Sequence, residues 1–146
     1  MQETLKILVV RFSSIGDIIQ SLSIIPKLKE SSINYEIHWL TKSEFEDLVK
    51  LQSNIDYVWA LDKSEGFLGL LKLGTLLRKE KFDILYDAHL NIRSILLRVI
   101  LFSSVRRTIV RSKDRIKRFL LFNFRIDKYP LPYKGMISFT TPLMQQ

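Results

Sequence analysis

A short polar loop near the start of the chain holds the side chains best suited to chemistry. Four apolar residues at 7–10 precede this loop, and apolar residues with helical spacing begin after Asp17. This order predicts a buried strand, a loop and a helix. Ser13 and Ser14 offer hydroxyl groups where the N–H groups of the helix N-terminus also point outward. Gly16 allows another molecule to approach closely, and Asp17 adds a carboxylate, so the loop is a candidate site.

On the residues alone, Asp17 has two possible roles. A carboxylate at the start of a helix usually stabilises that helix, by about 1 kcal/mol, and such residues greatly outnumber catalytic ones. The alternative is a role in ligand binding or catalysis, because ligands of parallel sheets bind at the carboxyl ends of strands, next to helix N-termini. Taken without further context, the residue types favour the helix-stabilising role.

The pattern along the rest of the chain predicts an α/β protein. Strands are expected at 7–10, 35–41, 57–61, 82–87 and 105–110. Helices are expected from residue 18 to about 30, and at 43–51, 64–81, 91–102 and 112–122. Regular alternation of strands and helices favours a parallel sheet with helices on both faces.

Two of these helices contain residues that disfavour helix. Pro26 lacks the backbone N–H and should kink or restart the first helix. Gly66, Gly69 and Gly74 each weaken the helix at 64–81 by up to about 1 kcal/mol relative to alanine, so a loose or broken helix is expected there. Ser64 is the expected N-cap of that helix.

Length and composition limit the possible classes of protein. With 146 residues, of which 47% are hydrophobic, the chain is long enough for one domain with its own core. It has no cysteine, which excludes a disulfide framework, a thiol nucleophile and a cysteine zinc site. We expect no signal peptide and no membrane-spanning helix, since Lys72 and Arg98 interrupt the apolar runs that come nearest to the roughly 20 residues required.

Positive charge is concentrated in the last third of the chain. The net charge is +8, and residues 91–146 hold twelve Lys and Arg against two acidic residues. Such a segment attracts anionic lipid head groups, phosphorylated glycolipid or nucleic acid, and charge alone does not choose among them. The residues predicted to contact phosphate groups or a membrane surface are Arg106, Arg107, Arg111, Lys113 and Arg115.

Several motifs, in order, resemble one protein family. Residues 11–19 (Arg-Phe-Ser-Ser-Ile-Gly-Asp-Ile-Ile) are similar to the opening motif of the bacterial lipopolysaccharide heptosyltransferases, glycosyltransferase family 9. Further similar segments follow at 36–40, 56–58, 82–87 and 91–94. The resemblance covers about residues 5–125, and collinear motifs are much more specific than a single one.

This resemblance implies a domain organisation. We expect an N-terminal, acceptor-binding half of a GT-B glycosyltransferase, with a Rossmann-like domain at 1–128. A tail at 129–146 would lead toward a C-terminal donor-binding domain that this chain lacks. The donor implied by the family is ADP-heptose, bound by the missing domain. We therefore expect no cofactor and no metal in this chain, and no sugar transfer by the chain in isolation.

The resemblance also changes the interpretation of Asp17. In the family, an acceptor hydroxyl displaces ADP from ADP-heptose with inversion, and one carboxylate suffices as general base. By its position in the motif, Asp17 is implied to be that base. Arg11 and the helix N-terminus would keep it ionised. Ser13, Ser14 and Gly16 are expected to contact the acceptor.

A second group of candidate residues follows the fourth predicted strand, and so belongs at the same edge of the sheet. Arg93 could hold a carboxylate or phosphate of the acceptor, or could be an ordinary exposed helix residue. His89 could bind the sugar, or could hydrogen-bond to the backbone. Asn91 completes this predicted substrate-binding set, whereas His38, inside a strand, is expected to be structural.

The implied partners follow from the same resemblance. They are the inner core and lipid A of lipopolysaccharide and the anionic inner-membrane surface, with the protein cytoplasmic and peripheral to the inner membrane of a bacterium. No nucleic acid partner is expected, and the residues do not specify an oligomeric state. The alternative hypothesis is a non-enzymatic module that uses its basic C-terminal third to bind a membrane surface or nucleic acid.

Overall fold

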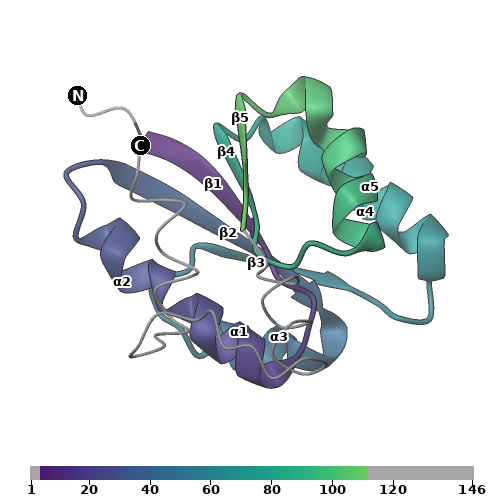
Figure 1. Cartoon of the computed structure of the whole chain (residues 1–146), viewed down its shortest axis with the longest axis horizontal. Helices are drawn as coiled ribbons and strands as arrows, with labels where there is room; N and C mark the ends of the chain where they lie inside the picture. The colour runs from purple at the N-terminus through teal and green to yellow at the C-terminus, as the bar shows by residue number, and fades with distance from the viewer. Residues whose placement is uncertain (1–3, 112–146) are drawn as a thin grey trace, which may run out of the picture.

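A computed structural model describes residues 4–111 of the chain, which form one parallel sheet flanked by helices (Figure 1). The strands are β1 (Thr4–Val10), β2 (Asn34–Lys42), β3 (Tyr57–Leu61), β4 (Ile84–Asp87) and β5 (Arg107–Val110). Their order in the sheet is β3-β2-β1-β4-β5, and all neighbouring pairs are parallel. The predicted Rossmann-like α/β fold is confirmed. The helix predicted at 112–122 and the predicted tail lie outside the described residues.

The helices cover both faces of the sheet, as predicted. One face carries α1 (Ile15–Leu22), α2 (Ile24–Lys29) and α3 (Glu46–Lys50), and the other carries α4 (Gly66–Glu80) and α5 (Ile92–Leu101) (Figure 1). Short 3₁₀ turns, Ser43–Phe45 and Phe102–Ser104, precede α3 and follow α5. In β1, Ile7 and Val9 belong to one core and Leu8 and Val10 to the other, because successive side chains of a strand point to opposite faces. The unbroken apolar run therefore reflects a central strand buried on both sides.

The first helical region is divided into two helices, in agreement with the kink or restart that was predicted from Pro26. Ser23 separates α1 from α2, and Pro26 lies in the first turn of α2, where a missing N–H is tolerated. Helix α1 begins at Ile15, earlier than the apolar spacing indicated, with Ser14 as its N-cap residue. Asp17 therefore lies within the first turn of α1.

Helix α4 is continuous, so the prediction of a loose or broken helix was wrong. A Cβ atom at Gly74 would lie 2.8 Å from Cγ2 of Ile100 in α5. The missing side chain thus lets α4 and α5 pack closely, and this packing outweighs the low helix propensity of glycine. Ser64 is not the N-cap either. Glu65 occupies that position, while the backbone N–H and hydroxyl of Ser64 both donate to Oδ1 of Asp62 at 2.7 Å.

His38 is buried in β2 and its ring nitrogens both have partners. Trp59 Nε1 donates to His38 Nδ1 at 3.0 Å, and His38 Nε2 lies 2.8 Å from Oε1 of Glu36. Since Trp59 can only donate, Nδ1 must be the acceptor and Nε2 the protonated nitrogen. The ring also contacts Tyr57 and Phe82, which agrees with the structural role expected for His38.

Candidate functional site

The order of the strands reverses its direction between β1 and β4. The chain leaves β1 toward α1 on one face and leaves β4 toward α5 on the other, and ligands of open α/β sheets bind at such a reversal, outside the carboxyl ends of the strands. The loops at 11–14 and 88–91 meet here, where the Ala88 N–H donates to the Val10 carbonyl at 3.1 Å. Both loops were expected at this edge of the sheet, and the structure makes them neighbours.

Arg11 joins these two loops. Its side chain is only 4% exposed, forms an ion pair with Asp17, and donates from Nη1 to the Ala88 carbonyl at 2.5 Å. The Ser14 hydroxyl donates to Oδ2 of Asp17 at 3.1 Å. The Asp17 side chain is 38% exposed, so the carboxylate is held in place yet remains accessible from solvent.

The surroundings of Asp17 favour its ionised form. Burial raises the pKa of the Asp17 carboxyl, but the charge of Arg11, hydrogen bonds from Ser14 and the charge of Arg111 together outweigh burial. The pKa of Asp17 therefore lies below its usual range, and the carboxylate is charged at neutral pH. Burial also lowers the pKa of Arg11, an effect that the carboxylate of Asp17 opposes.

Asp87, the last residue of β4, shapes this edge of the sheet and was not predicted as a site residue. It is fully buried, and its Oδ1 accepts the N–H groups of His89 at 3.0 Å and Leu90 at 2.8 Å. Its Oδ2 lies 3.4 Å from Nε of Arg98. Asp87 thus fixes the loop that leads into α5. The signal in the sequence was a carboxylate at the carboxyl end of an apolar strand.

The three residues predicted after β4 lie at this edge in different environments. His89 is half-buried, and its ring packs edge-on against Phe12 with 5.5 Å between centroids. Asn91 caps α5, since its Oδ1 accepts the Ser94 N–H at 2.9 Å while the Ser94 hydroxyl accepts the Asn91 N–H at 3.0 Å. Arg93 is exposed in the first turn of α5. Asn91 therefore has a structural role that the sequence analysis did not assign to it.

The predicted basic surface is divided between two edges of the sheet. Arg106 and Arg107 stand at the amino end of β5, whereas Arg111 follows its carboxyl end, about 13 Å further along the chain. Arg111 is only 7% exposed and lies near Arg11 and Asp17, unlike the exposed contact that was predicted. The other two predicted contacts, Lys113 and Arg115, lie outside the described residues. Of the predicted basic segment, the structure therefore describes two exposed arginines at one edge of the sheet and one buried arginine at the other.

Two other kinds of feature are absent from the part of the chain that the structure describes. Among residues 4–111, no group of three or more His, Asp or Glu side chains is placed to hold a metal ion. In the same range, no helix is long and apolar enough to cross a membrane. At the carboxyl edge, the described side chains place the ionised carboxylate of Asp17 beside Arg11 and near Arg111.

Comparison with known proteins gives one curated relative and several solved structures. No protein-family model matches the sequence. Lipopolysaccharide heptosyltransferase 1 of Campylobacter coli is 28% identical over 130 residues, which are 88% of this chain and 37% of the relative. The chain thus spans well under half the length of that relative.

The solved structures share the fold at low sequence identity. The glycosyl transferase family 9 protein of Veillonella parvula superposes with a TM-score of 0.72 at 19% identity, covering 97% of this chain and 41% of that one. The E. coli heptosyltransferase WaaC with ADP gives a TM-score of 0.66 at 14% identity, covering 97% and 46%. The E. coli ADP-heptose lps heptosyltransferase II gives a TM-score of 0.59 at 18% identity, covering 88% and 44%. The resemblance read from the motifs is therefore confirmed: over most of its length the chain is similar to part of the lipopolysaccharide heptosyltransferases of glycosyltransferase family 9, and it has the fold of about half of a GT-B glycosyltransferase.

Proposed function

We propose that this chain is the acceptor-binding part of a heptosyltransferase-type glycosyltransferase. The reaction we assign is the inverting transfer of heptose from ADP-heptose to the inner core of lipopolysaccharide. The observation that supports it most is the Arg11–Asp17 ion pair between β1 and β4, because it places an accessible, ionised carboxylate where ligands of this fold bind. The similarity to a curated heptosyltransferase supports the same class of reaction.

In this proposal, Asp17 is the general base. The acceptor oxygen forms a bond to the anomeric carbon of the heptose, the bond from that carbon to the diphosphate oxygen breaks, and ADP leaves. Asp17 takes the hydroxyl proton, and a single displacement inverts the anomeric configuration. A carboxylate with a lowered pKa is a weak base, so we place proton transfer late, when the new bond has made the hydroxyl proton acidic.

The surrounding residues would orient the acceptor. The loop at 13–16 offers two hydroxyl groups and backbone N–H groups beside the N-terminus of α1. Arg93, exposed at the start of α5, could bind a phosphate or carboxylate of the acceptor with two parallel hydrogen bonds. His89 and the amide nitrogen of Asn91 could donate hydrogen bonds to sugar hydroxyls. These assignments, like that of Asp17, are predictions for binding experiments.

The donor would be bound elsewhere. We propose that ADP-heptose occupies a second domain, corresponding to the part of the relatives that this chain does not span. The chain would then hold no cofactor, and its acceptor domain would occupy residues 1–128. Residues 1–146 alone would transfer no sugar, because the groups that stabilise the departing diphosphate would lie in that second domain. The location that fits this reaction is the cytoplasmic side of a bacterial inner membrane.

Backbone amide NMR of the full chain tests the acceptor assignment. A soluble phosphorylated inner-core oligosaccharide and ADP-heptose are titrated separately. We expect shifts at residues 13–17 and 88–94 with the oligosaccharide, and no shifts there with ADP-heptose. The physical reason is that only the acceptor has its binding groups at this edge of the sheet.

Matched variants separate Asp17 from other carboxylates at the same edge. Asp17→Asn should weaken oligosaccharide binding or change its pattern of shifts. Asp62→Asn is the control, because Asp62 also follows a strand and also accepts from a serine, but at the end of β3, two strands away from β1. A well-dispersed spectrum without shifts at 13–17 or 88–94 would overturn the site assignment.

A further inference from the structure

Helix α5 and the first residue of the 3₁₀ turn after it expose a row of apolar side chains, which we call the apolar stripe. The exposed fractions are 76% for Ile92, 43% for Ile95, 69% for Val99 and 84% for Phe102. Their spacing of three, four and three residues places them on one side of the helix. The opposite side of α5 packs into the core through Leu97 and Leu101. Single exposed apolar residues are ordinary, but a continuous row of four indicates a binding surface.

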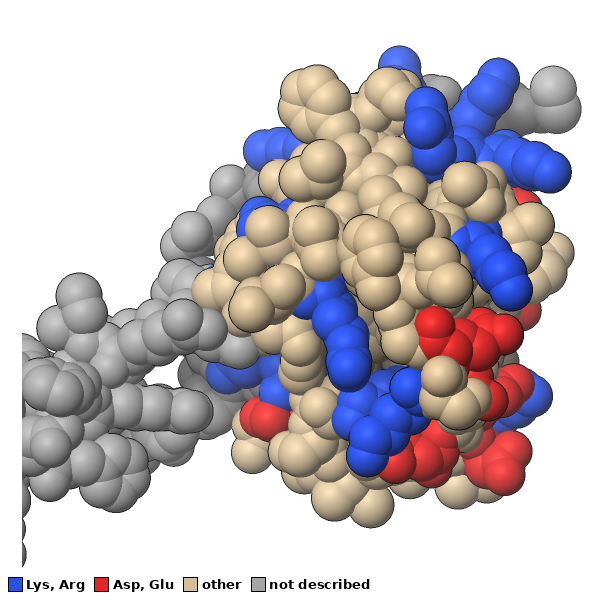
Figure 2. Space-filling model, turned by 90° about the vertical axis from the view of Figure 1, so that its right-hand side faces the viewer, with Lys and Arg blue, Asp and Glu red and all other residues tan. Residues whose placement is uncertain are grey.

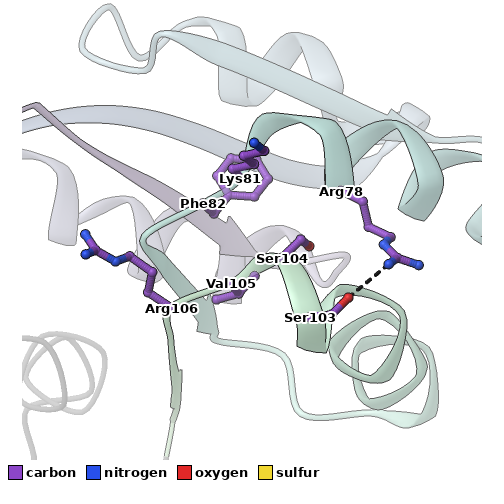
Figure 3. Close-up of a pocket in the computed structure, with 7 residues that line it drawn as sticks. All are labelled: Arg78, Lys81, Phe82, Ser103, Ser104, Val105 and Arg106. Carbon is purple, nitrogen blue, oxygen red and sulfur yellow. Dashed lines mark hydrogen bonds between the residues drawn. The ribbon is translucent and has the colours of Figure 1, made fainter.

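A hollow with positively charged walls lies beside the end of this stripe. Its volume is about 440 Å³, and it opens next to Ser103 and Ser104, which directly follow Phe102 (Figure 3). The residues that line it are Arg78, Lys81, Phe82, Ser103, Ser104, Val105 and Arg106. Arg78 Nη2 donates to the Ser103 hydroxyl at 2.9 Å, and Arg106 stands on the other side of the hollow. The lining combines three cationic side chains with two hydroxyl groups, which suits a phosphate group. Arg106 also pairs through Nη1 with Oδ1 of Asp83 at 3.2 Å, but its side chain is 74% exposed and so stays accessible to a ligand.

Basic residues also predominate where the stripe ends. Arg78, Lys79 and Lys81 near the end of α4 and Arg106 and Arg107 near the start of β5 are exposed, whereas Arg98 pairs with the buried Asp87 and Arg111 is itself buried. Figure 2 views the side of the molecule on which α4 and α5 lie in Figure 1. It shows a largely uncharged area with lysine and arginine side chains along its upper border, where α5 ends, and with acidic and basic side chains together at its lower right.

We propose that the apolar stripe and the cationic hollow together dock this protein on an anionic phospholipid bilayer. The stripe enters the boundary between head groups and acyl chains, as the apolar faces of interfacial helices do. The hollow receives the phosphate of one lipid head group, and the other cations face the negative surface. A protein partner would need an apolar surface for the stripe and an acidic rim for the cations. An anionic bilayer offers both, because its acyl chains accept the stripe and its phosphates pair with the cations.

This inference deepens the proposed function and rests on it only for the acceptor. Helix α5 begins directly after Asn91, so the apolar stripe starts at the edge of the sheet that holds Asp17 and ends at the opposite edge. A bilayer lying along the stripe would therefore bring the surface of the membrane next to the candidate site. An acceptor anchored in that membrane could then present its sugar to Asp17.

The test is co-sedimentation of the full chain with vesicles. Vesicles of phosphatidylethanolamine and phosphatidylglycerol should bind the protein, and salt should weaken this binding, whereas phosphatidylcholine vesicles should bind it weakly. The stripe variant Val99→Asp/Phe102→Asp should bind at least about tenfold more weakly. The hollow variant Arg78→Gln/Arg106→Gln should bind about twentyfold more weakly, since each arginine near an anionic surface contributes about fivefold.

Matched controls change equally exposed residues elsewhere. Leu51, which is 82% exposed after α3 on the other face of the sheet, provides the apolar control Leu51→Asp. Lys50→Gln/Lys63→Gln provides the charge control. Both should bind vesicles within about twofold of the unmodified chain. Equal losses in the controls and in the stripe and hollow variants would overturn the proposal, as would binding that does not depend on lipid charge.

Two further results distinguish this inference from the proposed function. If the unmodified chain fails to bind anionic vesicles but the soluble oligosaccharide still shifts residues 13–17, the docking inference fails and the acceptor assignment stands. If the chain binds the vesicles but the oligosaccharide causes no shifts, the acceptor assignment fails and the docking inference stands. A dimer in analytical ultracentrifugation that the stripe variant dissociates, together with no vesicle binding, would assign the stripe to a second copy of the chain and overturn the proposal.

Discussion

The two edges of the sheet use similar charged residues in different ways. At the amino edge, Lys6 Nζ lies 3.1 Å from Glu36 Oε1 and 3.2 Å from Glu80 Oε2. Glu36 in turn contacts His38. The side chains of Lys6, Glu36 and Glu80 are each about one-third exposed, so water already solvates the charges that they share. Around the start of β1, the charges at this edge are neutralised by these ion pairs.

At the carboxyl edge the charges are buried and arginine predominates. Arg11 and Arg111 are nearly inaccessible, as is Asp87, and of these four neighbouring charged residues Asp17 alone reaches solvent. Buried cations are costly unless they are paired, and here they surround a carboxylate that a ligand can also reach. The difference shows that the charges at the amino end of β1 are matched to one another, whereas those at its carboxyl end remain in a form that an incoming anionic ligand can use.

The largest expected effect comes from removing the buried carboxylate at the carboxyl edge. Asp87→Ala leaves the N–H groups of His89 and Leu90 without their acceptor and removes the partner of Arg98. Breaking a buried pair in this way should lower the free energy of unfolding by about 3–5 kcal/mol. Urea denaturation monitored by circular dichroism measures this loss.

Two control variants show whether burial is the cause. Asp87→Asn keeps an oxygen that can accept both N–H groups, so it should be less damaging than Asp87→Ala. Asp62→Ala removes an exposed carboxylate that also accepts two hydrogen bonds after a strand, and it should be milder still. A loss for Asp62→Ala as large as that for Asp87→Ala would contradict the assigned role of burial.

The next largest effect should come from breaking the ion pair between Arg11 and Asp17. Arg11→Met removes the buried cation next to Asp17 and should lower the free energy of unfolding by about 1.5–3 kcal/mol, the usual range for hydrogen bonds to charged groups. The pKa of Asp17 should rise, because burial raises it and its main opposing charge is gone. Carboxyl ¹³C NMR of the two proteins measures this rise.

The same variant predicts a change in acid stability. In the unmodified chain the pKa of Asp17 is lower in the folded state than its usual 3.8, so its contribution to stability is present above that pH and is lost as the pH falls through the folded value. Arg11→Met should reduce this acid-dependent loss. An unchanged pKa of Asp17 would show that Arg11 does not control the carboxylate.

Much of the fold could be predicted because the strands are short runs of apolar and aromatic residues that stand out in the sequence. The aromatic and apolar run at 57–61 coincides with β3, and the run at 7–10 lies wholly within β1. Local chemistry also predicted that Arg11 would assist the ionisation of Asp17, because the two residues flank one short loop. These features depend on neighbours in the sequence, which a single chain reveals.

The features that were missed depend on contacts between distant segments. Gly74 permits a continuous helix because Ile100 packs against it, and helix propensity contains no information on that contact. Asp87 and Arg111 belong to the site because β4 and β5 lie on one side of β1, and the order of strands was not predicted. Counting charge along the sequence likewise grouped Arg106 with Arg111, although a strand separates them.

The smallest effect should come from the amino edge. Lys6→Met is the counterpart of Arg11→Met, since one cation lies near the start of β1 and the other directly after its end. The ion pairs of Lys6 are partly exposed, so its loss should change the free energy of unfolding by only about 0–1 kcal/mol in urea denaturation.

Hydrogen bonds to Glu36 and Glu80 raise the pKa of Lys6 above 10.5, so its contribution is present below that pH and is lost as the pH rises through the folded value. Lys6→Met should therefore flatten the alkaline limb of the stability curve and leave the acid limb unchanged, the opposite of Arg11→Met. A loss equal to that of Arg11→Met would mean that the two edges do not differ in the way described.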